Sequence, residues 1–449
     1  MAGTFILGET KVRPGSYFNI QKKGGNAAAG VMNGVTAVIF KADFGPLNTA
    51  VELSAEDGYE RTFGTGLTTD AMKEAIAGGA KTIIACRVGN GGSQGTITLK
   101  DTDEEEALTI TAKYPGDKDF TVTIREKLSD SALKECIFYA GTTEFEKLEF
   151  SAGEGEVDAL VAALASSRNF KAEAKEGKGT AVLAAVSQSA FTKGINPQVT
   201  TGDYSNAFAQ VEPFDFNTIC LDTEDTEIHL LLQSFINRIF DAGSLCQAVV
   251  AEKHTVDLEI REAHAASFND EKMNYVLNAH IDEQGKEIDG YQTAARIAGM
   301  IGAAAANSSL THTVINGFSE IKEKLTNTEI IAAEKRGCLV LTYNKAKQVW
   351  IDNAINTLIT PADNQDDGWK KIRRVKTRFE LIRRINTSQI QGVGDSMREE
   401  GKLVACSVTE SSAYTADGDS AWFDIDVIDK DSMEHIYLTF LFRFSTNEE

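Results

Sequence analysis

The chain lacks a long uninterrupted apolar run. Its most apolar stretch, Ile297 to Ala306, is short and is broken by Gly299 and Gly302. A membrane-spanning helix needs about 20 predominantly apolar residues, so we expect no direct membrane insertion. The first ten residues also lack a basic region followed by an apolar one, so no secretory signal is predicted. We therefore expect the protein to be made and folded in the cytoplasm.

Closely spaced metal ligands are missing as well. The six cysteines lie far apart, and none forms a Cys-x-x-Cys pair. This pattern favours buried free thiols in a reducing compartment and offers no zinc site. Of the six histidines, His254 and His264 lie ten positions apart, which fits neither helical i,i+4 spacing nor a zinc finger. No metal site is expected.

Enzyme motifs are also absent. The glycine-rich stretch Gly89 to Gly95 lacks the Gly-Lys-Ser/Thr ending of a phosphate loop, and the lysine of Gly177 to Thr180 has the wrong spacing, so both are interpreted as turns or linkers. There is no Gly-x-Ser-x-Gly elbow. The acidic run Asp101 to Glu106 is more typical of a solvated loop than of paired catalytic carboxylates. Calcium remains an alternative there, although the EF-hand pattern is absent. No catalytic residue and no cofactor are predicted.

Composition places the chain among soluble globular proteins. Its 449 residues are enough for about two to four domains, and its hydrophobic content of 42% is enough for a large core. The formal net charge of −21 keeps free copies apart in solution and argues against a general nucleic-acid binder.

The pattern of predicted elements in the first half of the chain changes at Gly89. Before it, Val35 to Phe40 and Lys81 to Val88 read as strands around a helix at Asp70 to Ala77, an order that indicates a parallel-sheet unit. After it come short alternating strands with frequent turns, and one helix. The strands are expected at Thr96 to Lys100, Ala107 to Lys113, Phe120 to Glu126 and Cys136 to Ala140, and the helix at Val157 to Ser166.

Helices and strands alternate again after Asp203. The spacing predicts an amphipathic helix at Glu227 to Ala242 and a small-residue helix at Tyr291 to Ala306 whose Ala and Gly allow close packing. The fold class is therefore α/β (α+β), a core domain split by an inserted β-rich domain. The expected divisions are an N-terminal arm at 1–20, a core at 21–88 and 203–355, an insertion at 89–202 and an α+β C-terminal domain at 356–449.

The C-terminal domain carries two distinctive segments. One is an amphipathic helix with a cationic face, where Glu380 is the single acid among the basic residues. The other is a strand near the chain end, Ile436 to Phe444, with alternating apolar side chains. The cations of the helix are Lys370, Lys371, Arg373, Arg374, Lys376, Arg378, Arg383 and Arg384.

Several motifs in order along the chain resemble the contractile phage tail sheath family. They are Val12 to Tyr17, Gly34 to Val38 leading to Phe44-Gly45-Pro46, Phe63-Gly64, Ala75 to Ala80, Cys86-Arg87-Val88, Tyr114-Pro115-Gly116, Ala298 to Ala303 with Ser309-Leu310-Thr311, Lys371 to Val375, and Glu380-Leu381-Ile382. The chain departs from the family pattern at Asp117 to Phe120, where many members have a second Gly-Asn.

The resemblance implies a structural, non-catalytic subunit. Such a subunit would form hexameric rings stacked in a helical sheath around an inner tube, with baseplate and tail terminator proteins as further partners. It would assemble extended and then shorten to drive the tube through a cell envelope. The length is similar to that of compact sheaths from phage-like bacteriocins and defective prophages.

Two groups of residues then receive a predicted role. Strand arms are expected to pair with neighbouring subunits rather than with the chain's own sheet, and the basic helix is expected to contact an acidic tube rather than solvent or nucleic acid. A nucleotide-binding α/β enzyme is the alternative function, and a monomeric binding module a third. The arm residues are Phe5, Arg13, Tyr17, Leu438, Phe440, Phe442 and Phe444.

Overall fold

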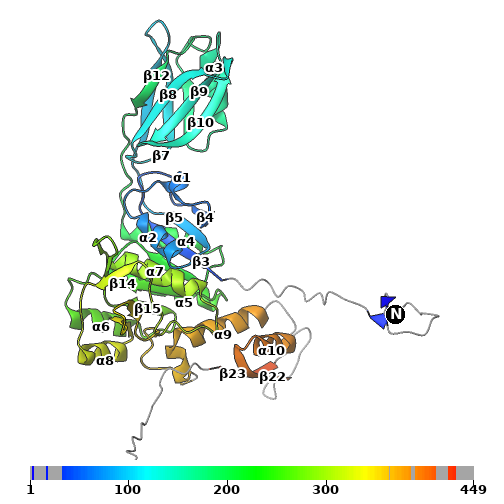
Figure 1. Cartoon of the computed structure of the whole chain (residues 1–449), viewed down its shortest axis with the longest axis vertical. Helices are drawn as coiled ribbons and strands as arrows, with labels where there is room; N and C mark the ends of the chain where they lie inside the picture. Colours follow the sequence, from blue (N-terminus) through cyan, green and yellow to red (C-terminus); the bar gives the residue numbers. More distant parts are fainter. Residues whose placement is uncertain are drawn as a thin grey trace, which may run out of the picture. The chain divides into compact units, whose positions relative to one another are not determined.

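The computed structural model describes residues 3–4, 17–18, 33–363, 365–385, 390–410 and 423–430. These residues divide into two compact units, a larger one at Asn33–Phe379 and a smaller one that includes Glu380–Lys430 (Figure 1). The division falls within one helix, so that each unit contains part of it. The two units are described separately below.

A seven-stranded sheet forms the centre of the larger unit. Its order is β19-β15-β14-β13-β3-β5-β4, and every pair is parallel except β4 with β5. The strands come from both sides of the predicted insertion, so the split core is confirmed. Their bounds are β3 (Val35–Phe40), β4 (Ala50–Ser54), β5 (Thr82–Arg87), β13 (Thr218–Leu221), β14 (Gln247–Ala251), β15 (Met273–Val276) and β19 (Cys338–Leu339).

Helices cover both faces of this sheet, because its strands are apolar on both sides. In β3, Val38 and Phe40 pack into one core with α2 and α7, whereas Ala37 and Ile39 pack into the other with α4 and α5. The result is a three-layer α/β sandwich (Figure 1). The helices are α1 (Glu60–Phe63), α2 (Asp70–Ala77), α4 (Thr201–Val211), α5 (Thr226–Asp241), α6 (Leu258–Phe268), α7 (Gly290–Ala303) and α8 (Asn327–Lys335).

Helices α2 and α7 cross at glycines. A Cβ at Gly299 would lie 2.0 Å from the Ala75 carbonyl oxygen, and one at Gly78 would lie 2.2 Å from the Arg296 carbonyl oxygen. Neither position leaves room for a side chain. The close packing expected of the small-residue helix is therefore confirmed. Arg296 adds a buried ion pair across the same contact, with 2.6 Å between its Nη2 and Glu74 Oε2.

The insertion forms a β-rich domain with its own core. A four-stranded sheet, β10-β9-β8-β12, and a three-stranded sheet, β11-β7-β6, enclose apolar side chains together with α3. The chain enters and leaves this domain through paired segments, with bridges at Asn90–Gln198 and Ser93–Ile195. The elements are β6 (Gln94–Lys100), β7 (Glu106–Pro115), β8 (Phe120–Lys127), β9 (Asp130–Ala140), β10 (Thr143–Ser151), α3 (Glu156–Ala165), β11 (Phe170–Ala174) and β12 (Val186–Ala190).

One aromatic side chain of the core domain belongs to the core of the inserted domain. Phe44 follows β3, is 1% exposed, and has ring centroids 5.3 Å from Tyr114, 5.0 Å from Phe120 and 5.8 Å from Phe145. Beside it the backbone of Gly116 lies so close to Asp43 that a Cβ would be 1.8 Å from the Asp43 carbonyl oxygen. This contact fixes the inserted domain on the sheet at a third point.

The remaining elements of the larger unit lead to the basic helix. A three-stranded sheet has the order β17-β16-β18, and β20 pairs with β21 in an antiparallel hairpin. A 3-10 turn, η1, then precedes α9. The bounds are β16 (His280–Asp282), β17 (Glu287–Ile288), β18 (Phe318–Ile321), β20 (Leu341–Tyr343), β21 (Val349–Ile351), η1 (Asp367–Lys370) and α9 (Ile372–Ile385).

The smaller unit contains the end of α9, helix α10 and a two-stranded sheet, β22-β23. Leu381, Val393, Met397 and Leu403 form its core. Two short strands near the N-terminus pair in parallel with each other. The bounds are α10 (Ile390–Glu399), β22 (Leu403–Glu410), β23 (Phe423–Asp429), β1 (Gly3–Thr4) and β2 (Tyr17–Phe18).

Two expectations about composition can be compared with the structure. All six cysteines are free, and five of them are buried, so the prediction of buried thiols is confirmed for all but Cys406, which is half-buried. Within the described ranges no helix is long and apolar enough to cross a membrane.

The packing of Phe44 generates a stability prediction. Phe44→Ala should lower the free energy of unfolding by about 3–5 kcal/mol, because it removes a buried ring and leaves a cavity between two domains. Urea unfolding followed by circular dichroism measures this. The control is Leu128→Ala, whose parent side chain is 99% exposed and whose effect should stay within about 0.5 kcal/mol. A loss below about 1 kcal/mol for Phe44→Ala would contradict the proposed junction.

Candidate assembly interface

A nucleotide site, the alternative prediction, would lie at the carboxyl edge of the central sheet. Doubly wound sheets bind ligands where the strand order reverses, which here is between β3 and β13. The buried carboxylate of Asp222 fills this position. It accepts hydrogen bonds from the Tyr204 hydroxyl (2.6 Å), the Thr68 hydroxyl (2.5 Å) and the Lys41 amide (2.9 Å). Burial, with Asp222 nearby, raises the pKa of Tyr204 and keeps this hydroxyl a donor.

Carboxylates also occupy the helix ends at this edge. Glu224 accepts a hydrogen bond from the Gly290 amide at the start of α7 (2.6 Å), and Asp70 at the start of α2 accepts from the Tyr291 hydroxyl (3.0 Å). Burial raises the pKa of both Asp70 and Glu224. A phosphate bound at these helix N-termini would have to displace or face these acids. The geometry therefore opposes nucleotide binding here.

The apolar side of α9 attaches the basic helix to the larger unit. Ile372, Val375 and Phe379 are 1%, 0% and 3% exposed, and Phe379 lies with its ring centroid 5.8 Å from that of Phe240 on α5. Lys376 donates to the carbonyl oxygens of Ile301 and Ala304 at the end of α7, where the helix dipole favours a cation. The apolar side of this part of α9 therefore belongs to the core of the larger unit.

The cations of α9 and η1 divide into two groups. Arg373 and Arg384 are buried, each 5% exposed, and Arg384 pairs with Glu380 (2.5 Å) and Glu400 (2.8 Å) inside the smaller unit. The other six cations are half-buried. These are Lys370 paired with Asp367, Lys371 bonded to Asn353, Arg374 against Gly368, Lys376 on α7, Arg378 paired with Asp366, and Arg383. Contact between these cations and a tube stays a prediction.

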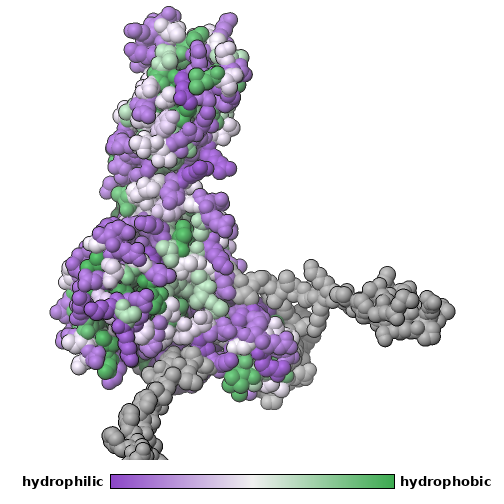
Figure 2. All heavy atoms as spheres, viewed as in Figure 1, coloured by the Kyte–Doolittle hydropathy of each residue, from purple (hydrophilic) through white to green (hydrophobic). Residues whose placement is uncertain are grey.

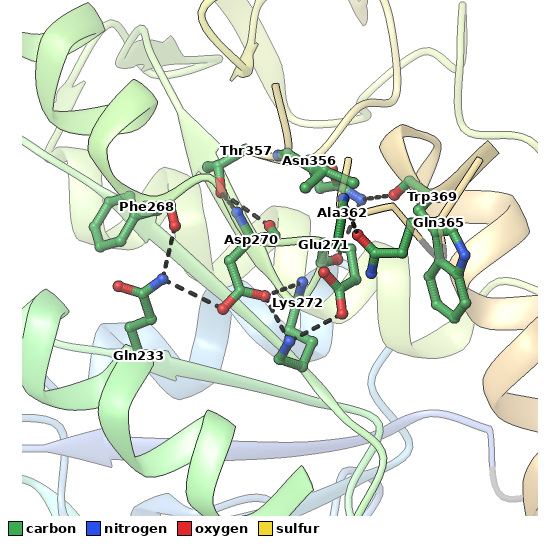
Figure 3. Close-up of polar contacts among 11 residues, drawn as sticks. Gln233, Phe268, Asp270, Glu271, Lys272, Asn356, Thr357, Ala362, Gln365 and Trp369 are labelled. Carbon is green, nitrogen blue, oxygen red and sulfur yellow. Dashed lines mark hydrogen bonds and ion pairs between the residues drawn. The ribbon is translucent and has the colours of Figure 1, made fainter. Parts of the chain in front are cut away.

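A polar network positions the chain just before the basic helix (Figure 3). Lys272 lies 2.8 Å from Asp270 and 2.9 Å from Glu271, and Asn356 donates both to the Glu271 carbonyl oxygen (3.1 Å) and to the Trp369 carbonyl oxygen (2.7 Å). The network therefore joins the start of β15 to η1. Sequence reasoning missed it, because Asn356 and Glu271 are 85 residues apart and follow no local pattern.

The same segment borders a cavity of about 540 Å³ between α8 and η1. Apolar side chains, including Ile331 and Leu358, and charged ones, including Glu334, Lys370 and Lys371, line it. Burial raises the pKa of Glu334 to about 7, and the Asp352 carboxylate contributes, while Asn353 and Lys371 oppose the shift. A protonated Glu334 is therefore favoured by the fold.

This carboxyl generates a pH prediction. Because the folded-state pKa of Glu334 exceeds its ordinary value, its stabilising effect is full below about pH 4.5 and is lost as pH rises through about 7. The glutamine in Glu334→Gln stays neutral at every pH, so the variant does not lose stability as pH rises. Between pH 5 and pH 8 its free energy of unfolding should increase on the order of 1 kcal/mol relative to wild type, after allowing for solvent screening. Urea unfolding at several pH values measures it. The exposed Glu283→Gln is the control, and equal pH profiles for all three proteins would refute the assignment.

The predicted strand arms are described only in part. Tyr17 lies in β2, whose backbone pairs with β1. Phe5, Arg13, Leu438, Phe440, Phe442 and Phe444 lie outside the described residues. Their pairing with other subunits stays a prediction.

The structure does show a sheet that could receive such arms. In the described part of the chain β22 pairs only with β23, so each strand has one open edge. One face of the pair packs on the core of the smaller unit through Cys406 and Val427. On the other face Val404 and Ile428 are 56% and 53% exposed, and Figure 2 shows hydrophobic atoms over β22 and β23. Sequence reasoning missed this sheet, although the alternation of Asp424, Asp426 and their apolar neighbours is a strand signal.

Comparison with known proteins gives a family match in the core domain. A family model described as the phage tail sheath protein central domain matches residues 197–357. Two proteins of Bacillus subtilis (strain 168) are similar over 90% of this chain. The uncharacterized protein YqbK is 24% identical, with 84% of it covered, and the phage-like element PBSX protein XkdK is 22% identical, with 85% of it covered.

Solved structures share the fold. The sheath tail protein DSY3957 of Desulfitobacterium hafniense superposes with a TM-score of 0.67 at 20% identity, over 93% of this chain and 100% of that one. The helical sheath of the anti-feeding prophage in its contracted state gives a TM-score of 0.50 at 12% identity, over 96% of this chain and 99% of that one. The core domain over residues 197–357 therefore matches the phage tail sheath central domain, and the chain shares its fold with solved sheath proteins, in agreement with the motifs along the sequence.

Proposed function

We propose that this protein is a tail sheath subunit that polymerises into hexameric rings stacked as a helical sheath around an inner tube, and that the sheath shortens to drive the tube through a target cell envelope. The single observation that carries the proposal is the two-stranded sheet β22-β23, whose two edges have no partner strand among the residues that the structure describes, in a chain with strand-forming ends. Strand addition at such edges supplies main-chain hydrogen bonds between subunits.

Strand addition between subunits is compatible with a lattice that rearranges. Ladders of backbone hydrogen bonds stay intact while the segments that lead to them bend, so rigid bodies can rotate without losing their neighbours. The larger unit supplies such a body, because Phe44 and the paired entry strands fix its inserted domain. The contracted anti-feeding prophage sheath, which shares the fold, supports a two-state lattice. We place the protein first in the host bacterial cytoplasm and then in the particle, with tube, baseplate and tail terminator proteins as partners.

The free energy that drives contraction comes, in this proposal, from a change in subunit packing and not from a catalysed reaction. The extended lattice would be trapped after assembly on the tube and would release free energy as the subunits repack. The half-buried cations of α9 and η1 are the proposed tube contact. Exposed ion pairs contribute only about 0–1 kcal/mol each, which suits a contact that must hold and then release.

Deletion of residues 436–449 tests the strand linkage. The truncated subunit should be soluble and folded, with a wild-type circular dichroism spectrum, and should form no tubular polymers in negative-stain micrographs. Polymers of wild-type appearance from the truncated chain would exclude exchange of the C-terminal strand.

Charge reversal tests the tube contact. Arg374→Glu with Arg383→Glu should leave the subunit folded, since both side chains are half-buried, and should abolish sheath assembly on the tube. Particle yield by electron microscopy measures this. The matched control is Arg168→Glu with Lys171→Glu, two exposed cations of the inserted domain, which should leave the yield unchanged. Normal particles from the α9 variant would reject the contact.

A further inference from the structure

Three side chains that line the cavity between α8 and η1 form a hydrogen-bonded row. Lys371 Nζ donates to Oδ1 of Asn353 (3.0 Å), and Nδ2 of Asn353 donates to Oε2 of Glu334 (3.3 Å). All three side chains border the same space of about 540 Å³. A side-chain amide therefore lies between an amine, which is a nucleophile once it loses a proton, and a carboxyl group that can move protons.

Backbone pairing holds the amine against the amide. The Ile372 amide donates to the Ala354 carbonyl oxygen (3.2 Å), and the Asn356 amide donates to the Lys370 carbonyl oxygen (3.1 Å). The two segments that carry the amine and the amide are therefore neighbours in the backbone as well as through their side chains. Groups that are held together in this way react with little loss of freedom.

The carboxyl group of Glu334 is suited to proton transfer. Burial raises the pKa of Glu334 to about 7, and the Asp352 carboxylate adds to the shift. The apolar side chains of Ile331 and Leu358 border the same cavity. A carboxyl group with a pKa near neutrality can both accept a proton and return it, whereas an ordinary glutamate is a weaker base.

From this geometry we propose that Lys371 and Asn353 condense into an isopeptide bond, with Glu334 as the proton carrier. The Glu334 carboxylate takes one proton from the Lys371 ammonium group, and the freed amine attacks Cγ of Asn353. A second proton passes from the amine nitrogen to Nδ2, the bond between Cγ and Nδ2 breaks, and ammonia leaves with the proton from Glu334 as ammonium. One ammonium group and one primary amide thus give one secondary amide and one ammonium ion, with no further reactant.

The bond would close residues 353–371 into a covalent loop that ties the start of α9 to the end of the β20-β21 hairpin. Such a loop restricts the unfolded chain, as a disulfide does. In a shortening sheath it would keep the first turn of α9 attached to the larger unit under load. The inference goes beyond the proposed function and does not depend on it, because the bond forms within one chain.

Mass spectrometry of the purified full-length protein tests the bond. The wild-type mass should be lower than the mass calculated from the sequence by about 17 Da, the mass of ammonia. Tandem spectra of a digest should show residues 353 and 371 in one branched peptide. Lys371→Arg should have its full calculated mass, because a guanidinium group does not lose its proton. Glu334→Gln should also have its full mass, since a glutamine amide cannot carry the proton.

The matched control is Lys370→Arg. Lys370 lines the same cavity but pairs with Asp367, so this variant should show the same mass loss as wild type. A missing bond in Glu334→Gln would lower the free energy of unfolding equally at every pH, and would leave the predicted pH dependence of that variant unchanged.

The wild-type mass decides whether the bond forms, and the variants assign it to its residues. Wild-type protein at its full calculated mass would overturn the proposal, and so would loss of ammonia at residue 353 without a link to residue 371. A link that persists in Glu334→Gln would remove the role of that carboxyl group. These outcomes are separate from failure of the proposed function, in which the chain lacking residues 436–449 would still form polymers.

Discussion

A strand at the edge of a sheet has backbone amide and carbonyl groups on one side with no partner in that sheet, and among the described residues this holds for both β22 and β23. A two-stranded sheet is marginally stable alone in water, and here one face rests on a small core of four apolar side chains. Added strands would satisfy the edges and cover Val404 and Ile428. The proposed assembly depends on this constraint, because under that proposal other copies supply the strands that complete the sheet.

The larger unit can be understood as a rigid body. The three-layer sandwich, the glycine crossing of α2 and α7, and the Phe44 junction all reduce internal motion in the larger unit. Helix α9 begins in that unit, held by Ile372 and Val375, and ends in the smaller one, where Arg384 pairs with Glu380 and Glu400. The buried Arg373 and Arg384 are therefore part of the fold, and the proposed tube contact is left to the half-buried cations.

The sequence predicted the regular elements well and the sheet of the smaller unit not at all. Strand Val35–Phe40 and helix Asp70–Ala77 have the predicted bounds, since an apolar run or a 3.6-residue period defines them locally. The cationic face of α9 was predicted from charge alone, and charge cannot show that Arg373 and Arg384 are buried. Their partners, like those of Lys272 and Asp222, come from distant parts of the chain, and only the folded structure brings them together.

The central claim is that the smaller unit's sheet is completed between molecules. A cryo-electron microscopy map of the assembled particle, at a resolution that traces the backbone, tests it most directly. The account predicts a four-stranded sheet in which β22 and β23 of one subunit are flanked by one strand from each of two other subunits. A map in which both arms fold back onto the subunit they come from, with no sheet shared between molecules, would contradict it.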